Sequence, residues 1–251
     1  MTILIYLIYH NDSSYQAIKE YENYPYIKLV RIETTKYFES IIFKYLAENK
    51  NDWISKKYVG LLTYSFKRKL RISLDRLFNI LNTDKYDLVS LHHVKGPYSI
   101  LGGSFHGDLK KKIFDHVLPM FGYETPINYN IPTFFCNYWI TRPIWMEKYI
   151  DFALAFIDKL NDENDTYLQS MLNSSSQYIG KLTPSQLTKL FGVPYYPNHP
   201  FIMERLPCIF FWKNNFTKTS RKSARFAGWR SGQPPTPAST GASAGSLSRA
   251  S

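Results

Sequence analysis

The sequence has 251 residues, of which 44% are hydrophobic and 17% aromatic, so it can bury one sizeable core and is not disordered as a whole. No apolar run approaches the roughly 20 residues of a membrane-spanning helix, so we expect no transmembrane segment. The formal net charge of +11 suggests nucleic acid as a partner, but six of the 31 Lys and Arg residues, and none of the 20 acids, lie beyond residue 216. The first 216 residues are therefore only mildly basic, with 25 cations against 20 acids.

The C-terminal segment, residues 217–251, differs from the rest in composition. It contains no Ile, Tyr or Asn and is dominated by Ser, Ala, Gly, Pro, Thr and Arg. Such a composition cannot bury enough apolar surface to offset chain entropy. We therefore predict a folded domain over residues 1–216 followed by a disordered basic tail. An origin in an expression vector or a shifted reading frame is one interpretation of this tail, and a native linker is the alternative.

The N-terminal half begins with three apolar runs that predict strands, at Ile3 to His10, Tyr26 to Ile32 and Tyr58 to Leu62. The first run lacks a basic leader and a cleavage site, so we expect a cytoplasmic protein. Between the second and third strands, Thr34 or Thr35 can cap a helix, which has one apolar stripe formed by Tyr37, Phe38, Ile41, Ile42, Tyr45 and Leu46.

Further along, Ser73 begins a predicted helix, and Tyr86 to Leu91 is a predicted strand that ends at His92-His93. A Gly-rich segment leads into a predicted helix from about Asp108 to Phe121. The remaining predicted elements are a strand over Thr133 to Thr141, a long helix from Pro143, a charged turn over Asn161 to Asp165, a helix begun by the capping box Thr183 to Gln186, and an apolar helix over Phe201 to Trp212. Alternating strands and helices indicate an α/β fold.

A polar, then basic run follows the Tyr58 to Leu62 strand. It contains the hydroxyls of Thr63 and Tyr64 and the cations Lys67 and Arg68. Ligands of open α/β sheets bind beyond the carboxyl ends of the strands, so this run suits an anionic ligand such as a phosphorylated substrate. A solvated basic loop is the alternative.

Several enzyme signatures are missing from the chain. It has no Gly-x-Gly-x-x-Gly after the first strand and no Gly-x-x-x-x-Gly-Lys-Ser/Thr, which argues against dinucleotide enzymes and P-loop ATPases. A nucleophile elbow and a Cys/His protease signature are also missing. Cys136 and Cys208 lie in apolar surroundings and predict buried free thiols.

Three stretches resemble a known family. Trp53 to Tyr64 resembles the Val-Gly-Leu-x-His-Tyr-Arg-Arg segment of the capsular polysaccharide and lipopolysaccharide glycosyltransferases of the DUF4422 type. Phe135 to Thr141, with the Trp145 to Tyr149 helix, resembles that group's Asn-containing strand and Trp/Tyr helix, and Phe201 to Leu206 resembles its Glu-Arg-Leu helix. Thr63 stands where the family has His, and Ser65-Phe66 replaces its paired arginines.

The resemblance implies a single GT-A-like, Rossmann-like domain with a central, mostly parallel sheet flanked by helices. It implies an enzyme that transfers a hexose or deoxyhexose from a UDP-, GDP- or dTDP-linked donor to a glycan or glycolipid acceptor. We assign donor binding to His10, Asn11, Thr63, Tyr64, Lys67, Arg68 and Arg205, in which the cations neutralise the departing diphosphate. Asp108 and His106 are candidate catalytic bases by position, and Asn137 and Glu204 are assigned to the acceptor or to structure.

Many GT-A enzymes hold a divalent metal with Asp-x-Asp, which this chain lacks. We therefore expect metal-independent transfer, with Mn²⁺ or Mg²⁺ held by His92 or His93 and Asp87 as the alternative. Two further functions stay open. One is a nucleic-acid-binding module that uses Lys67 to Arg71, Lys110 to Lys112 and the many tyrosines, and the other is an inactive scaffold with a glycosyltransferase-like fold.

Overall fold

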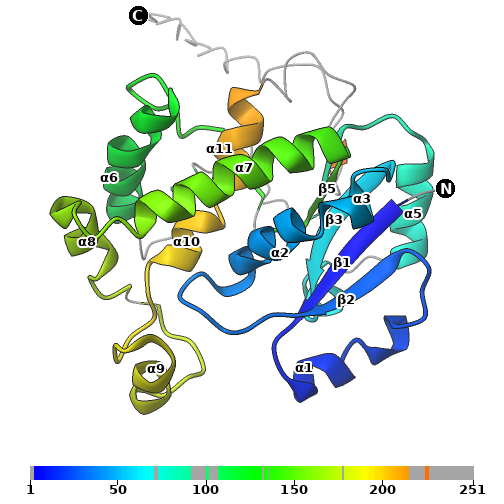
Figure 1. Ribbon diagram of the computed structural model, residues 1–251, viewed down its shortest axis with the longest axis horizontal. Helices are drawn as coiled ribbons and strands as arrows, with labels where there is room; N and C mark the ends of the chain where they lie inside the picture. The colour runs from blue at the N-terminus through cyan, green and yellow to red at the C-terminus, as the bar shows by residue number, and fades with distance from the viewer. Residues whose placement is uncertain are drawn as a thin grey trace, which may run out of the picture.

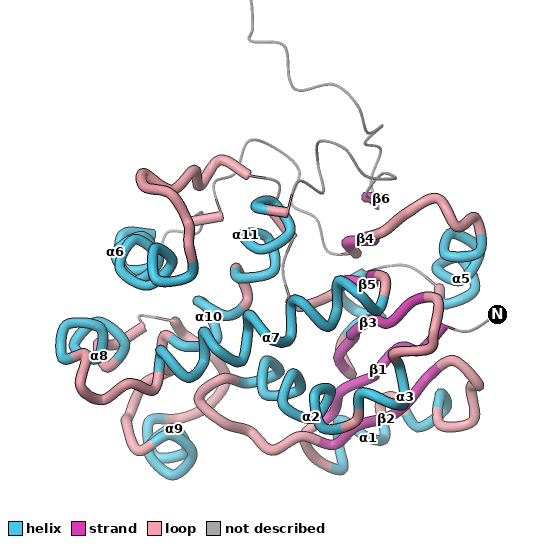
Figure 2. Tube along the Cα trace, turned by 45° about the horizontal axis from the view of Figure 1, so that its top comes forward, coloured by secondary structure: helices cyan, strands magenta, loops and turns pink. Residues whose placement is uncertain are grey.

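The computed structural model describes residues 3–70, 73–91, 100–101, 107–131, 133–134, 136–176, 178–214 and 224–225. A mixed sheet in the order β2-β1-β3-β5-β4-β6 runs through the molecule (Figure 2). Its strands are β1 (Ile3–Tyr9), β2 (Ile27–Arg31), β3 (Tyr58–Thr63), β4 (Leu88–Ser90), β5 (Trp139–Thr141) and β6 (Ala224–Arg225). β1 is parallel to β2 and β3, and β4 is parallel to β6, whereas β5 is antiparallel to both of its neighbours, β3 and β4.

Helices cover both faces of the sheet (Figure 1), because the side chains of β1 alternate between two cores. Tyr6 and Ile8 face the larger core, which is closed by α2 (Ile42–Glu48), α7 (Pro143–Leu160) and α11 (Leu206–Lys213). Ile5 and Leu7 face the other core, which is closed by η1 (Lys19–Tyr21), α4 (Phe66–Leu70) and α5 (Leu74–Asn82). Two covered faces explain why the central strands β1 and β3 are apolar along most of their length.

The pairing of β3 with β5 depends on a glycine. Gly60 lies opposite Ile140, and a Cβ atom built on Gly60 would come within 2.3 Å of Cγ1 of Ile140. No side chain fits at that distance, so only glycine lets these two strands approach each other.

The remaining helices lie around the sheet and its two main layers (Figure 1). α1 (Asp12–Gln16) follows β1, and α3 (Lys50–Trp53) precedes β3. η2 (Phe38–Ile41) leads into α2, and α6 (Gly107–Val117) continues into η3 (Leu118–Phe121). α8 (Thr166–Leu172), α9 (Pro184–Phe191) and α10 (His199–Met203) follow α7 in sequence. None of the described helices is long and apolar enough to span a bilayer.

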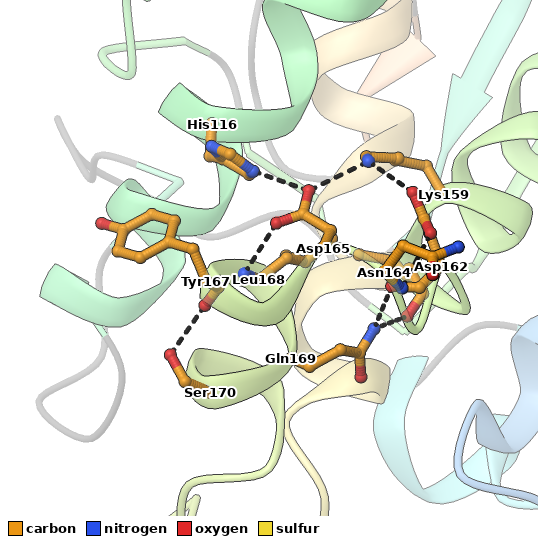
Figure 3. Close-up of polar contacts among 10 residues, drawn as sticks. His116, Lys159, Asp162, Asn164, Asp165, Tyr167, Leu168, Gln169 and Ser170 are labelled. Carbon is orange, nitrogen blue, oxygen red and sulfur yellow. Dashed lines mark hydrogen bonds and ion pairs between the residues drawn. The ribbon is translucent and has the colours of Figure 1, made fainter.

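The turn between α7 and α8 is built around Asp165 (Figure 3). Asp165 caps α8 by accepting the amide of Leu168 at 3.0 Å, and it also pairs with His116 of α6 at 2.8 Å and with Lys159 of α7 at 2.9 Å. Hydrogen bonds from these partners, first from His116, hold the pKa of Asp165 well below its usual range. One carboxylate thus contacts α6, α7 and α8, so the predicted charged turn has a structural role.

The predicted α/β fold with a mostly parallel sheet is confirmed, but several element boundaries were wrong. Of the strand expected over 133–141, only β5 joins the sheet. The helix expected over 201–212 is two helices, because Pro207 has no N–H to continue α10. Neither Thr34 nor Thr35 caps α2, which begins after η2, and α8 was not predicted. The capping box of α9 is confirmed.

The domain boundary at residue 216 stays a prediction. Residues 224–225 form β6 beside β4, and the rest of the 217–251 segment lies outside the described residues.

Candidate functional site

The carboxyl edge of the sheet gathers polar side chains from segments far apart in the sequence. β1 and β3 are parallel, so His10 and Thr63 end neighbouring strands at this edge. β5 runs the opposite way, and the amide of Leu91, after β4, donates to the carbonyl of Tyr138 at 2.8 Å. The segment that enters β5 therefore lies beside the carboxyl ends of β3 and β4, where α/β folds place their ligands.

Three hydroxyl groups form a network at this edge. The hydroxyl of Thr63 forms hydrogen bonds with the hydroxyls of Tyr138 and Ser65, and the Thr63–Ser65 distance is 3.1 Å. The hydroxyls of Ser65 and Tyr138 are in turn 3.2 Å apart. Thr63 and Tyr138 are buried, and burial raises the pKa of the Tyr138 phenol, so it stays protonated. The network can donate hydrogen bonds to an anionic or hydroxylated ligand.

The basic run after β3 forms α4, and its two lysines, Lys67 and Lys69, contact different residues. The ammonium of Lys69 lies 5.4 Å from the centroid of the Tyr138 ring and 3.5 Å from Sγ of Cys136. Lys67 instead pairs with the carboxylate of Glu20 and lies over the ring of Tyr21. Helix geometry therefore brings Lys69 to the hydroxyl network and turns Lys67 away from it. Arg68, the other predicted donor cation, is exposed.

Cys136 and Asn137, which precede β5, both adopt left-handed backbone conformations, with φ of +67° and +53°. Successive non-glycine residues in this region are strained and need support from their surroundings. The amide of Cys136 donates to Oε1 of Glu204 at 2.7 Å, and Nδ2 of Asn137 donates to Oγ of Ser40 at 3.3 Å. Oδ1 of Asn137 is buried and has no hydrogen-bond partner among the residues that the structure describes.

A second polar pair lies after β1. Nε2 of His10 is 4.0 Å from Oε1 of Glu39, and the ring of His10 meets that of Tyr64 edge-on at 6.0 Å. Burial acts to raise the pKa of Glu39, but its interactions with His10 and with its own backbone amide outweigh burial and lower the pKa. Asn11 is already engaged, because its side chain accepts the amide of Ser14 at 2.9 Å as the N-cap of α1.

Arg205 lies at the break between α10 and α11, beside the strained Cys136 segment. Its guanidinium pairs with Glu204, and its Nε donates to the carbonyl of Ile100 at 3.2 Å. Glu204 therefore accepts from Cys136 with one oxygen and from Arg205 with the other. Burial lowers the pKa of Lys110 of α6 to about 8, with a smaller effect of Arg205 in the same direction and of Glu204 in the opposite one.

Other predicted residues are not part of this arrangement. Asp87 precedes β4, at the strand end opposite the carboxyl edge, and its carboxylate accepts from Arg142 at 3.4 Å. Asp108 is exposed in the first turn of α6. His92, His93 and His106 lie outside the described residues, so their assignments stay predictions. Within the described ranges, no group of three or more His, Cys, Asp or Glu side chains could hold a metal.

Comparison with known proteins supports the fold. No protein-family model and no curated protein matches the sequence. Among solved structures, the chain is similar to the apo structure of the bifunctional glycosyltransferase WbbM, with a TM-score of 0.52 and 14% identity. The match covers 86% of this chain and 43% of that one, so this chain spans less than half of its length. The likeness establishes an α/β fold that a glycosyltransferase also has, and the narrower DUF4422 resemblance stays a prediction.

Sequence reasoning missed part of the cluster. It did not assign Ser65, Lys69, Tyr138 or Glu39 to a site, although Lys69 stands in the basic run and Tyr138 in a stretch quoted for the resemblance. These residues carry hydroxyl or charged groups and lie close to predicted strands, and that pattern was visible in the sequence. The pairing of β3 with β5, which brings them together, could not be read from the sequence.

Proposed function

We propose that this protein is a glycosyltransferase that uses a nucleoside-diphosphate-sugar donor and a glycan or glycolipid acceptor. The observation that supports it most is the cluster of Thr63, Ser65, Tyr138 and Lys69 at the carboxyl edge of a sheet whose fold a known glycosyltransferase shares. Hydroxyl donors beside a cation suit an oxygen-rich anionic ligand.

In this proposal, each part of the edge has a role. Lys69 and Arg205 stabilise charge that develops on the diphosphate, which is the role that divalent metals take in many enzymes of this chemistry. Asn137 and the hydroxyl network orient hydroxyls of donor or acceptor. Asp108 and His106 stay the candidates for the base that activates the acceptor hydroxyl, and the sugar is a hexose or deoxyhexose.

The test is a panel of UDP-, GDP- and dTDP-linked sugars. Release of nucleoside diphosphate would be measured with and without EDTA, Mn²⁺ or Mg²⁺, and binding would be measured by thermal shift. A ligand at a hundredfold excess over its dissociation constant stabilises the native state by about 2.7 kcal/mol, which such a scan detects. Absence of both turnover and stabilisation across the panel would overturn the proposal, whereas stabilisation without turnover would favour an inactive scaffold.

The nucleic-acid alternative loses several of its cations to internal contacts. Lys67 pairs with Glu20, Lys111 pairs with Asp115, and Lys110 is buried. These residues have little charge to offer to a phosphate backbone. A gel shift at increasing salt concentration distinguishes the two functions, since tight, salt-dependent binding would favour nucleic acid.

A further inference from the structure

His199 is a buried imidazole without a hydrogen-bond partner. It is the first residue of α10, with 3% of its surface exposed, and neither Nδ1 nor Nε2 has a partner among the described residues. Its ring meets the ring of Tyr37 edge-on, with 5.2 Å between the ring centroids. Such a place suits a neutral imidazole, because a buried charge needs a counterion or hydrogen bonds.

No negative charge compensates a proton on this ring. Within the described ranges, His10 and His116 are the histidines that pair with carboxylates, and His199 is not among them. The charge close to it is positive, because the ammonium of Lys36 lies 5.5 Å from the centroid of the same Tyr37 ring. A protonated His199 is therefore an unpaired buried charge near another cation, and moving into water stabilises it.

The titratable groups around His199 act in the same direction. Burial and, to a smaller extent, Lys36 lower the pKa of His199 to about 3. The carboxylate of Asp158 interacts electrostatically with Tyr37, and that of Glu163 interacts with Lys36. Neither carboxylate acts on His199 itself. The folded position of His199 thus excludes a proton that an imidazole accepts readily in water.

The segment that begins at Tyr37 ends at the carboxyl edge of the sheet. Glu39 lies 4.0 Å from Nε2 of His10, and Oγ of Ser40 accepts a hydrogen bond from Nδ2 of Asn137 at 3.3 Å. The chain between these contacts is one tight turn, since the amide of Ser40 donates to the carbonyl of Tyr37 at 3.1 Å. A displacement of Tyr37 is therefore passed on to the residues at the edge.

Phe38, in the middle of this turn, has a left-handed backbone conformation with φ of +46°. A non-glycine residue in this region is strained and persists only where its surroundings hold it. The ring of Phe38 packs against Phe191 of α9 at 5.7 Å and against Tyr196, just before α10, at 6.4 Å. The strained turn is thus held by the same part of the chain that carries His199.

We infer that residues 37–41 form a pH-sensitive switch, in which protonation of His199 releases this segment from α10 and loosens the carboxyl edge of the sheet. The charge gained by His199 has to reach water, so its contact with Tyr37 is lost. The turn at Phe38 then loses support for its strained conformation, and Glu39 and Ser40 move with it. The switch acts on the polar edge whatever ligand binds there, so it does not rest on the proposed function.

Hydrogen exchange of the full chain at pH 7.5 and pH 5.5, followed by mass spectrometry and corrected for the intrinsic pH dependence of exchange, tests the inference. A histidine with an ordinary pKa of about 6.5 in the open segment favours opening about tenfold more at pH 5.5 than at pH 7.5. Protection of the peptide that carries the amides of Ser40 and Ile42, which both donate within the segment, should fall about tenfold. α5, which packs on the other core, should keep its protection.

Three variants identify the group that takes up the proton. His199→Phe and His199→Leu have no imidazole, so both should keep the peptide protected at pH 5.5, and their different shapes separate the loss of the proton from a packing defect. His116→Gln is the matched control, because it removes another histidine that is mostly shielded from water. It should show the same tenfold fall as wild type.

The outcomes separate the sensor from the coupling. An equal fall in wild type and both His199 variants, or no fall in wild type, would overturn the inference. A fall of the same size in α5 would also overturn it, because the whole domain would then be unfolding. A fall confined to α10, with residues 37–42 still protected, would reject the connection to the carboxyl edge.

Discussion

The amide of Cys136 donates to the carboxylate of Glu204 at 2.7 Å, and this bond connects the strained segment before β5 to the break between α10 and α11. The two irregular features stabilise each other, because the helix break exposes the carboxylate that the left-handed segment requires. The same carboxylate also holds Arg205, so one side chain fixes both the segment before β5 and this guanidinium.

Replacement of Glu204 should therefore destabilise the fold. Glu204→Ala leaves the Cys136 amide without an acceptor and Arg205 without its carboxylate, and we expect a loss of about 2–3 kcal/mol in the free energy of unfolding. Glu204→Gln keeps an acceptor oxygen and should lose about half as much. Urea denaturation of the three proteins measures this order, and an unchanged midpoint in Glu204→Ala would show that the bond contributes nothing.

Lys69 and Lys67 should behave differently although they are two residues apart. Lys69→Met should weaken binding of the nucleoside diphosphate that the panel identifies by about tenfold, as loss of a charged contact does. Lys67→Met removes an exposed pair with Glu20 and a contact with the Tyr21 ring, both away from the hydroxyl network, and should leave affinity unchanged. Titration by calorimetry compares them, and the reverse order would restore the assignment made from the sequence to Lys67 and Arg68.

Gly60→Ala should destabilise the sheet. The added methyl group collides with Cγ1 of Ile140, and overpacking of this kind costs about 1–3 kcal/mol. In an Ile140→Ala background the colliding atom is gone, so the same substitution should cost clearly less. A double-mutant cycle by urea denaturation tests this coupling, and additive effects of the two substitutions would contradict it.

Stability should fall in mild acid because of His199. This residue is buried, both ring nitrogens lack a hydrogen-bond partner among the described residues, and its ring meets Tyr37 edge-on at 5.2 Å. Burial, with a smaller effect of Lys36, lowers the pKa of His199 from 6.5 to about 3. Below pH 6.5 the unfolded chain therefore binds a proton that the folded chain does not, so stability is lost as pH falls from 6.5 towards 3.

At pH 5 this loss amounts to about 2 kcal/mol relative to neutral pH, at 1.36 kcal/mol per pKa unit. His199→Phe has no proton to bind, so the difference in unfolding free energy between the variant and wild type should grow by that amount from pH 7.5 to pH 5. Urea midpoints at the two pH values measure it. A constant difference would mean that His199 is protonated in the folded state.

The sequence predicted the elements that depend on local pattern. β1 and β3 are mostly apolar runs that are buried on both faces, and the boundaries of β1, β2 and β3 agree with the predicted ones to within one residue. Pro207 was visible in the sequence, but the apolar run around it led to the prediction of one continuous helix. α8 was not predicted because its N-cap, Asp165, was interpreted as part of a charged turn.

The site was less predictable, since it depends on contacts between distant segments. Nothing local says that Tyr138 reaches the hydroxyl of Thr63, 75 residues away, because that contact requires β5 to be antiparallel to β3. The choice between Lys67 and Lys69 depends on which side of the five-residue α4 faces the sheet edge. Glu20 and Tyr21, which hold Lys67, come from a segment that no pattern connects to α4.

The reversed direction of β5 has a consequence for how such a protein can diversify. β5 contributes three residues to the sheet, and Cys136, shortly before it, lies 3.5 Å from the ammonium of Lys69 at the carboxyl edge. Substitutions in residues 136–138 can therefore change the polar groups at this edge without altering the order of the strands. The polar groups at the edge and the strand that fixes the order of the sheet are encoded in adjoining stretches of chain, so a substitution in one need not disturb the other.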